Sequence, residues 1–555
     1  MRHLFLLVLP LTACTTDPGT DSGDGDSGDS AADTADTGDT GCATPLPWYA
    51  DADGDGFGDV NTAVTACEAP AGHVADATDC DDAAAAVHPD ATEVYCNDVD
   101  EDCSGAADLP GLWVPGDHAT LQAAVDAAAS GSTVCVDAGQ ADKALTVDRG
   151  EGFTVTILGA GADATALVGT GATRVLSGDV EVRDLTVRSD GEGFVVGAGG
   201  TLGLVDVQVD GAGCGTYCGG YVAWVEGALD ATGLVVGGVD MEGEFTSSVA
   251  MFHAAWGSSV SLTDFRVEGN RVETSGTEIT EGPDTWWQGY AENDGVIGGA
   301  GGTVSLLDGV IVDNEFRSSR SQVYMLGYDV EGTIRGVEVT GNTATSSDGE
   351  AIFLYAGGRS LTISQTMISD NVLTGPGVSF MGAESADLVV ENVVVAGNVL
   401  QADADGSSQS GGWFWVGWGT GALTNVTFAD NRIDEDVYVW GGGLANLSGA
   451  SLSLTSSAFV DLTWGGDRPL VYSDTAAPAV AASFFHGNSG VTYEGAVTGT
   501  IEASVADPRF VDAAGRDYHL AEGSPLIDAG AGGVQDADGS ACDVGGFGGP
   551  EGSGW

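Results

Sequence analysis

A run of alternating aspartates and glycines, W-Y-A-D-A-D-G-D-G-F-G-D at residues 48–59, has the composition of a calcium-binding loop. Oxygen donors fall at loop positions 1, 3, 5, 7 and 9: Asp51, Asp53, Asp55, the carbonyl of Phe57, and Asp59. Gly56 stands at position 6, where the chain must turn sharply. Position 12, where an EF-hand has a bidentate Glu, is Thr62, and no helix pattern flanks the loop. The sequence therefore predicts a calcium loop that takes a further ligand from elsewhere in the chain.

Two nearby acidic clusters can supply that ligand. The first contains Asp79, Asp81 and Asp82, and the second contains Asp98, Asp100 and Asp102. Residues 42–109 carry sixteen Asp and Glu but neither Lys nor Arg. Hard carboxylate oxygens at this density suit Ca²⁺ rather than Zn²⁺ or copper. The alternative is a solvated acidic loop, but the regular placement of Asp and Gly favours structural Ca²⁺ as a cofactor.

The whole segment resembles the MopE-type metal-binding repeat of bacterial surface proteins. The matching stretches are residues 48–59, C-E-A-P-A-G at 67–72, D-C-D-D at 79–82, H-P-D-A-T-E at 88–93 and C-N-D-V-D-E-D-C-S-G at 96–105. The resemblance implies a calcium-binding module, and no copper site is carried over because no His/Cys cluster matches one. Asp98 and Ser104 depart from the usual Gly and Asp, which puts the ligand set of the last loop in question.

Such a small module has little core, so disulfides are expected to stabilise it. We expect Cys67 to pair with Cys80 and Cys96 with Cys103, although four cysteines allow three connectivities. Cys214 and Cys218 are expected to form a local disulfide. Cys42 is the best partner for Cys135, which leaves Cys542 free or intermolecular.

Most of the chain repeats an eleven-residue pattern with apolar residues at positions 1, 3, 6 and 8 and Asn or Asp at position 11. Clear copies begin at Val180, Val260 and Val304, and successive starts lie between 22 residues (Val180 to Leu202) and 44 residues (Val260 to Val304) apart. Alternation predicts strands, and a fixed unit with variable insertions is typical of a solenoid. The fold class is therefore all-β, a right-handed parallel β-helix. The recurring asparagines are predicted to stack at one bend: Asn270, Asn314, Asn342, Asn371, Asn398, Asn431 and Asn488.

This ensemble resembles the pectin-lyase-like superfamily. The only convincing helix pattern, 119–129, ends at Gly131, precedes a predicted strand at 133–136, and resembles the amino-terminal cap of that fold. Residues 507–530 resemble the closing segment of surface-anchored β-helix proteins called choice-of-anchor Q. The resemblance implies the fold; activity is left open, because this fold serves lyases, hydrolases, adhesins and spacers.

Aromatic residues gather in two insertions after the asparagine bend. One carries Trp286 and Trp287, and the other carries Trp413, Trp415 and Trp418. These rings either stack on sugars or, for the second set, fill the coil interior. A lyase would need a base such as Arg271, Arg317 or Arg320 beside acids. Such acids are present near these arginines: Glu273, Glu278, Glu281 and Asp284. Charges of this kind usually only solvate loops, so no catalytic residue is assigned.

The amino terminus predicts export. Residues 1–13 have the charged and apolar regions of a signal peptide, and L-T-A-C at 11–14 resembles a bacterial lipobox, which implies lipidation at Cys14. Residues 15–41 contain eight Asp, no basic residue and no aromatic residue, which predicts a disordered tether. The net charge of −67 excludes a nucleic-acid partner.

The expected organisation is a signal peptide (1–13), a tether (14–41), a metal-binding module (42–109), a β-helix with its cap (110–505) and a closing segment (506–555). The leading hypothesis is an exported, calcium-binding lipoprotein at the outer membrane or cell surface. Its β-helix would serve adhesion or glycan binding, with a polysaccharide or another cell surface as partner. The alternatives are a polysaccharide lyase or glycoside hydrolase on the same scaffold, and a structural surface spacer.

Overall fold

The computed structural model describes residues 44–92, 94, 96–97, 99–105, 112–189, 193–211, 221–243, 249–274, 278–279, 289–290, 295–299, 301–319, 322–328, 331–403, 410–439, 441–465, 468–489, 491–495 and 506–552. The chain divides into two compact units. One runs through Ala91 and includes Glu101–Cys103; the other comprises Thr92–Asp100 and everything from Ser104 onward. In the described residues no helix is long and apolar enough to cross a membrane.

The first unit is built on a three-stranded antiparallel sheet. The central strand β1 (Leu46–Ala50) pairs with β2 (Val64–Ala66) on one side and β3 (His73–Val74) on the other. The short 3-10 helix η1 (Val60–Thr62) leads into β2. Val87 is the only buried hydrophobic residue in the described part of 44–105. This unit therefore has almost no core, as its acidic composition suggests.

The second unit begins with a cap. Strand β4 (Leu112–Val114) pairs with β5 (Ser132–Val136), and helix α1 (Leu121–Ala127) lies between them in the sequence. Thr120 caps α1 by accepting from the backbone N of Ala123 at 3.2 Å, and the helix buries its apolar face. The predicted helix is confirmed but ends sooner, because Ala128 adopts an extended backbone.

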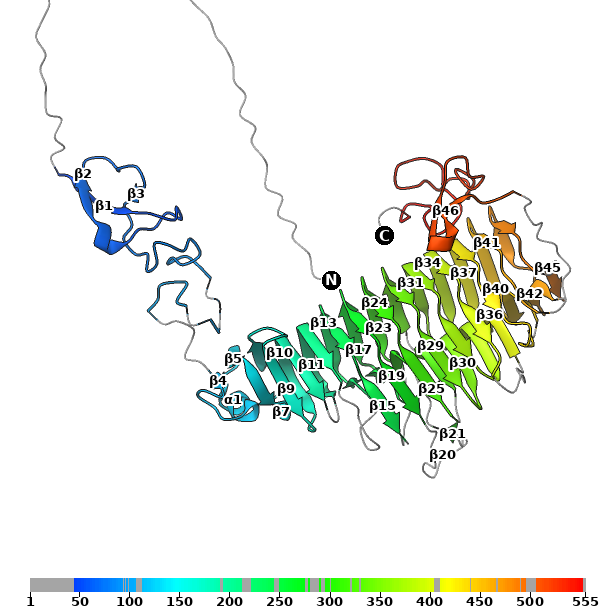
Figure 1. The fold of residues 1–555 in the computed structure, drawn as a ribbon, viewed down its shortest axis with the longest axis horizontal. Coiled ribbons are helices and arrows are strands. Elements are labelled where there is room, and N and C mark those ends of the chain that lie inside the picture. Colours follow the sequence, from blue (N-terminus) through cyan, green and yellow to red (C-terminus); the bar gives the residue numbers. More distant parts are fainter. Residues whose placement is uncertain are drawn as a thin grey trace, which may run out of the picture. The chain divides into compact units, whose positions relative to one another are not determined.

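The β-helix rises from this cap as a stack of parallel coils (Figure 1). The first coils consist of β6 (Gly139–Asp142), β7 (Leu145–Asp148), β8 (Thr154–Gly159), β9 (Thr165–Gly169), β10 (Thr173–Ser189) and β11 (Phe194–Asp210). Beyond them the coils form two faces, with a third face built by the coils from β15 to β38. The predicted all-β, parallel β-helix fold is confirmed.

Face 1 comprises β12 (Ala223–Val225), β16 (Phe252–Ala254), β22 (Ile297–Gly299), β26 (Val323–Tyr328), β30 (Glu350–Gly357), β33 (Gly377–Glu384), β36 (Ser410–Gly417), β39 (Ala445–Ser448), β42 (Pro469–Ser473) and β45 (Val491–Gly495). Face 3 comprises β15 (Asp240–Gly243), β19 (Arg271–Thr274), β25 (Glu315–Ser318), β29 (Thr343–Ser346), β32 (Val372–Thr374), β35 (Val399–Gln401) and β38 (Arg432–Ile433). A short antiparallel pair, β20 (Glu278–Ile279) and β21 (Gly289–Tyr290), lies in the insertion after β19.

Face 2 lies between them along the chain and is bent. Its first part comprises β13 (Ala228–Thr232), β17 (Ser259–Thr263), β23 (Thr303–Leu307), β27 (Glu331–Arg335), β40 (Ser451–Thr455) and β43 (Ala479–Ala481). Its second part comprises β14 (Val235–Gly237), β18 (Arg266–Glu268), β24 (Val310–Val312), β28 (Glu338–Thr340), β41 (Ala458–Val460) and β44 (Phe484–His486). Three longer strands run through both parts: β31 (Leu361–Ser369), β34 (Asp387–Ala396) and β37 (Thr420–Ala429).

The bend of face 2 sits at position 5 of the eleven-residue repeat. In the copy that starts at Val260, positions 1, 3, 6 and 8 are buried. Position 5 is Asp264, whose φ is 53°, and the equivalent Asp308, Asn392 and Asn425 have φ of 52°. Asp and Asn tolerate this left-handed conformation better than other non-glycine residues. Position 5 thus turns the chain between the two parts of face 2.

The predicted asparagine ladder is confirmed for six of its seven members. Asn342 shows the pattern: its Nδ2 donates to Oδ1 of Asn371 at 3.0 Å, and its own Oδ1 accepts from Nδ2 of Asn314 at 2.9 Å. The same side-chain bond links every neighbouring pair from Asn270 to Asn431. Asn488 stands apart and binds the backbone of Leu462 instead. These amides are structural, as expected.

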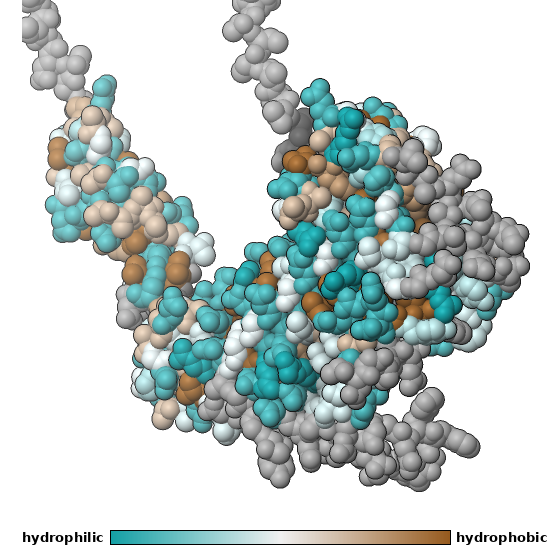
Figure 2. All heavy atoms as spheres, turned by 45° about the vertical axis from the view of Figure 1, so that its right-hand side comes forward, coloured by the Kyte–Doolittle hydropathy of each residue, from teal (hydrophilic) through white to brown (hydrophobic). Residues whose placement is uncertain are grey.

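The carboxy-terminal residues 506–552 pack on the outside of the coils. They contain the hairpin of β46 (Phe510–Asp512) and β47 (Asp517–Leu520), joined by the 3-10 helix η2 (Ala513–Gly515). Tyr518, Leu526 and Val544 form a buried apolar cluster with the outward residues of β34, β37 and β41. Figure 1 shows β46 beside these strands. Elsewhere on the β-helix, hydrophilic side chains cover most of the face that Figure 2 shows.

Candidate functional site

The predicted metal loop follows β1 and is closed by backbone bonds. Asp51 N donates to Gly72 O at 3.0 Å, and Asp59 N donates to Ala50 O at 3.1 Å. Gly56 has a φ of 100°, which the sharp turn requires. At Gly58 a Cβ would lie 2.8 Å from Ala50 O, so only glycine allows this close approach. These contacts fold residues 51–59 into a compact loop.

Backbone amides within the loop orient its carboxylates. Asp51 Oδ1 accepts from Gly54 N at 2.7 Å, Asp53 Oδ1 accepts from Asp55 N at 3.4 Å, and Asp55 Oδ1 accepts from Phe57 N at 2.9 Å. Alternate Asp residues can each form such a turn with the amide two or three positions later. The second oxygens of Asp53 and Asp55 are left available for another interaction.

Asp79 joins this loop from the first of the two acidic clusters. Its backbone N donates to Gly58 O at 3.3 Å, and it forms a β-bridge with Asp59. Its Oδ1 accepts from Asp81 N at 2.8 Å, and the residue is only 6% exposed. Asp82 also approaches, because its Oδ1 accepts from Ala52 N at 2.8 Å. Of the ligands predicted from this cluster, Asp79 and Asp82 therefore reach the loop.

Two groups of three carboxylates result. Asp53, Asp55 and Asp79 each offer an oxygen within 4.8 Å of the others, and so do Asp51, Asp53 and Asp82. The Oδ2 atoms of Asp53, Asp55 and Asp79 are buried and accept no hydrogen bond. Burial raises the pKa of Asp79, and the charges of Asp55, Asp53 and Asp82 raise this pKa further. Buried, unpaired anionic oxygens are costly unless a cation lies among them, so this donor set fits a hard metal ion.

The other predicted ligands have different roles or lie elsewhere. Asp59 Oδ1 accepts from the backbone and side chain of Asn61, both at 2.8 Å, and so caps η1. Asp81 Oδ1 accepts from Ala83 N at 3.4 Å. Asp100 accepts from Ser104 N at 2.9 Å and Gly105 N at 2.8 Å. Neither Asp59, Asp81, Asp100 nor Asp102 is in a group of close ligand atoms among the described residues, and Asp98 lies outside them.

Two further loop residues have roles in packing. The Thr62 hydroxyl accepts from Ala50 N at 2.7 Å and donates to Asp59 O at 2.6 Å, so this position closes the loop where an EF-hand would have a ligand. The Phe57 ring stacks on His88, with ring centroids 5.1 Å apart. The sequence pattern did not reveal either contact.

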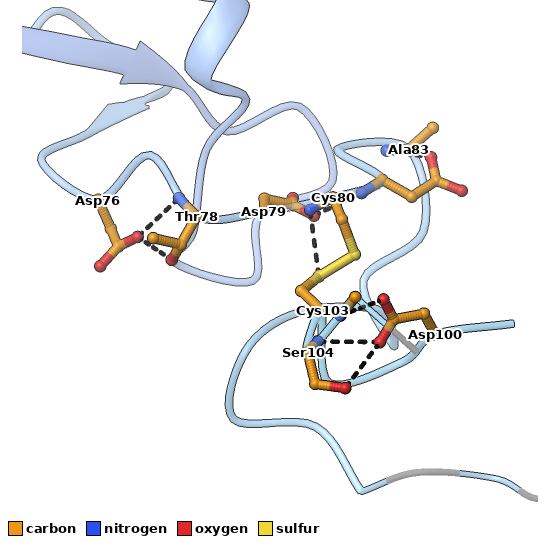
Figure 3. Close-up of a disulfide and its surroundings, with 10 residues drawn as sticks. Asp76, Thr78, Asp79, Cys80, Ala83, Asp100, Cys103 and Ser104 are labelled. Carbon is orange, nitrogen blue, oxygen red and sulfur yellow. Dashed lines mark hydrogen bonds between the residues drawn. A yellow bond between two sulfur atoms is a disulfide. The ribbon is translucent and has the colours of Figure 1, made fainter. Parts of the chain in front are cut away.

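The predicted pairings of Cys67 with Cys80, Cys96 with Cys103 and Cys42 with Cys135 are wrong. Cys80 pairs with Cys103, with Cα atoms 5.7 Å apart, and Cys96 pairs with Cys135, with Cα atoms 5.5 Å apart. The first bond lies next to Asp79, which shares its backbone turn (Figure 3). Because Cys96 is bonded to Cys135, Cys42 cannot be the partner of Cys135. Cys67 is also disulfide-bonded. Cys542 is free, one of the two predicted states, and it is also buried. Cys14, Cys42, Cys214 and Cys218 lie outside the described residues.

The tryptophans of the second insertion have three different environments. Trp413 is fully buried and packs edge-on against Phe380 and Phe428, each 5.2 Å away, so it fills the coil interior and contacts no sugar. Trp415 is half-buried and lies parallel to Tyr355, at 6.5 Å. Trp418 is 64% exposed and lines a groove of about 450 Å³. Trp286 and Trp287 lie outside the described residues.

The candidate lyase base Arg271 is neutralised by acids on face 3. Its Nη1 lies 3.2 Å from both Asp240 and Glu242, and it also contacts Glu273 and Glu315. The hydrogen bond to Glu242 is the largest cause of a raised pKa of Arg271. A catalytic base must first lose its own proton, and the neighbouring carboxylates hold the proton on Arg271. This environment therefore opposes a role of Arg271 as a base. Arg317 likewise binds Glu315.

The other charged residues considered for a lyase site are Glu278, Arg320, Glu281 and Asp284. Glu278 belongs to β20, and Arg320, Glu281 and Asp284 lie outside the described residues.

Comparisons with known proteins find one sequence motif and several distantly similar folds. The family Cu-binding MopE, described as a "putative metal-binding motif", matches residues 79–108. That stretch contains Asp79 and Asp82 but not the loop at 51–59. No curated protein matches the chain.

Three solved structures are distantly similar. They are the Dettilon tailspike protein (11% identity, 63% of this chain, TM-score 0.28), pectate lyase Pel9A (13% identity, 77% of this chain and 90% of that one, TM-score 0.27) and the A-module of the Azotobacter vinelandii mannuronan C-5 epimerase AlgE6 (15% identity, 67% of this chain and 94% of that one, TM-score 0.23). The chain spans 62% of the length of the tailspike. A shared fold at this distance does not determine activity.

Proposed function

We propose that this chain is an exported, lipid-anchored protein whose calcium-organised amino-terminal module presents a β-helix for adhesion or glycan binding. The module holds Ca²⁺ through Asp53, Asp55 and Asp79, with Asp51 and Asp82 beside them. The anchor is a lipid on Cys14, and the acidic residues 15–41 are the tether to the outer membrane or cell surface. The metal-binding motif and the parallel β-helix are the parts of this proposal that observation already supports.

One observation carries the metal site: three buried Oδ2 atoms, on Asp53, Asp55 and Asp79, accept no hydrogen bond. All close ligand groups among the described residues consist of Asp alone, with no thiolate or imidazole. Oxygen-only donors favour Ca²⁺ over copper or zinc. The Cys80–Cys103 disulfide stabilises the turn that carries Asp79, so the ligand from outside the loop is held in place.

The test compares two Asp-to-Asn variants of the full chain by calcium titration calorimetry. Asp53→Asn keeps the Oδ1 that accepts from Asp55 N but replaces the unpartnered Oδ2 by an amino group. The matched control is Asp76→Asn, because the Asp76 carboxylate already accepts from Thr78 and belongs to neither ligand group. We expect at least about tenfold weaker binding for Asp53→Asn, about 1.4 kcal/mol, and no change for Asp76→Asn. Equal affinities, or no calcium binding by the wild type, would overturn the proposal.

Anchoring has a separate test. Cys14→Ser is expected to move the protein from the membrane fraction to the soluble fraction, since two or more acyl chains are needed for stable attachment. Cys542→Ser is the control, because that thiol is free and buried. A wild-type protein that is already soluble and carries no acyl mass would contradict the lipid anchor.

The enzymatic alternative has less support. Ion pairs occupy Arg271, one of the three arginines (with Arg317 and Arg320) that a lyase could use as a base. Incubating the full chain with polysaccharides while following both unsaturated products and new reducing ends separates the readings. Unsaturated products favour a lyase, and new reducing ends without unsaturation favour a hydrolase. Binding without turnover favours adhesion, and the absence of both binding and turnover favours a spacer.

A further inference from the structure

A groove of about 450 Å³ runs across the turns that join face 1 to face 2 on five successive coils. It is lined by residues of the turns after β30, β33, β36, β39 and β42, among them Ser360, Asp387, Trp418, Thr420, Ser451 and Thr475. Neighbouring strands of a sheet are about 4.8 Å apart, so five coils span about 19 Å. The groove therefore has the length of a short chain of linked units rather than of one small molecule.

Trp418 provides a flat apolar surface in this groove. It is 64% exposed, an unusual state for so large a hydrophobic side chain. Its ring packs against Gly449, where an added Cβ would lie 2.7 Å from Trp418 Cδ1. No aromatic ring or guanidinium among the described residues stacks on it. Trp256 differs in this respect. It is 76% exposed, but the guanidinium of Arg359 lies over its ring, 4.6 Å from the ring centroid.

Hydrogen-bonding groups surround the Trp418 ring. The Asp387 carboxylate accepts from the Thr420 hydroxyl at 2.5 Å, which holds this acceptor in one orientation. Hydroxyls of Ser360, Ser451 and Thr475 belong to the same lining. An aromatic face for C–H groups, surrounded by acceptors and hydroxyls, is the combination that a sugar ring requires.

The negative charge of the groove favours neutral sugars over anionic ones. No Lys, Arg or His is among the described residues that line it, and Asp387 adds a negative charge to a chain whose net charge is −67. The nearby Arg359 is directed to Trp256 and to Glu331, 3.6 Å away. A polyanion such as a uronate polymer would meet unfavourable potential and no cationic partner.

We infer that this groove binds a neutral glycan, with a sugar ring stacked on Trp418 and the chain running across the coils. The inference rests on the proposed glycan-binding function and specifies its site and its ligand class. The experiment measures binding of the full chain to soluble neutral polysaccharides (a β-glucan, a xylan and a mannan) and to two uronates, pectate and alginate, by affinity electrophoresis.

Three variants accompany the wild type. Trp418→Ala should lose at least about tenfold in affinity for the neutral glycan, Trp418→Phe should keep most of it, and Trp256→Ala should match the wild type. Retained binding by Trp418→Ala overturns the groove but leaves glycan binding elsewhere intact. Preference for a uronate overturns the ligand class. Failure to bind any of these polysaccharides overturns this inference and the glycan-binding part of the proposed function, while the calcium titration still tests the metal site.

Discussion

The guanidinium of Arg516 binds the carboxylate of Asp370, which lies 146 residues earlier in the chain. Arg516 Nε donates to Asp370 Oδ2 at 3.1 Å. Two residues later, the Tyr518 hydroxyl donates to Asp430 Oδ2 at 2.9 Å. Gly397 lies on the coil between, and a Cβ there would be 2.0 Å from Arg516 Nη2. Asp370, Gly397 and Asp430 thus form a docking site on successive coils for the carboxy-terminal hairpin.

Weakening this docking site should release the carboxy-terminal hairpin without unfolding the β-helix. Arg516→Ala removes a pair whose side chains are 30% and 46% exposed, so solvent screening limits the loss to about 1 kcal/mol. Gly397→Ala should cost more, because its methyl group occupies the place of the guanidinium at a φ of 66°. Hydrogen exchange should show faster exchange in 506–552 for both variants and unchanged exchange in β17, β23 and β27. Unchanged exchange in the hairpin would contradict this role.

The same end of the β-helix should be sensitive to pH through Asp461. Burial, and then the charge of Asp430, raises the pKa of Asp461 above its ordinary 3.8, against a smaller opposing effect of His486. The folded form therefore holds this proton more tightly than the unfolded form. Its contribution to stability is present at low pH and is lost as the pH rises through the raised pKa. Asp461→Asn should accordingly raise Tm at neutral pH, with a gain that shrinks on acidification. A gain that is constant with pH would rule out this linkage.

Much of the fold could be predicted because each coil repeats the same local requirements. Val260 and Leu262 are buried, as their alternation indicates, and Asn270 to Asn431 stack as their spacing implies. The bend at position 5 was missed, although Asp, Asn or Gly recurs there in the sequence. The docking of Arg516 on Asp370 could not be predicted, since it depends on which outward face the chain meets after leaving the last coil.

The site was predictable only in part, for a similar reason. The Asp-Gly alternation at 51–59 identified the loop, because ligand spacing there is local. Which distant carboxylate completes it depends on the bridge between Asp59 and Asp79, a tertiary contact. The disulfide pairings were predicted wrongly for the same reason, because they also depend on tertiary contacts. Cys96 is closer in sequence to Cys103 but is bonded to Cys135, 39 residues away.

The asparagine ladder should contribute strongly to stability. Asn371 Oδ1 accepts from both N and Nδ2 of Asn342 at 3.0 Å, and its own Nδ2 donates to Val339 O and to Asn398 Oδ1. Asn371→Ala leaves these buried groups without a partner, at an expected cost of about 3 kcal/mol. Ser364→Ala, on the half-exposed side of the same strand β31, is the control and should change little. Denaturant unfolding of the full chains provides the comparison, and equal midpoints would refute the importance of the ladder.

Calcium removal should destabilise the amino-terminal unit alone. Its carboxylates repel one another by about 4 kcal/mol for a pair 4 Å apart at an effective dielectric constant of 20. Against this the described part of the unit has one buried hydrophobic residue, Val87, whereas the β-helix stacks a continuous apolar interior. At a Ca²⁺ concentration one hundred times Kd, binding would raise the free energy of unfolding of this unit by about 2.7 kcal/mol. Hydrogen exchange of the full chain in excess chelator should therefore speed up in 44–92 and stay constant in β30–β37. Asp53→Asn should exchange fast in 44–92 with or without Ca²⁺. If protection of 44–92 is the same in calcium and in chelator, the buried Oδ2 atoms of Asp53, Asp55 and Asp79 need no cation, and the metal site is refuted.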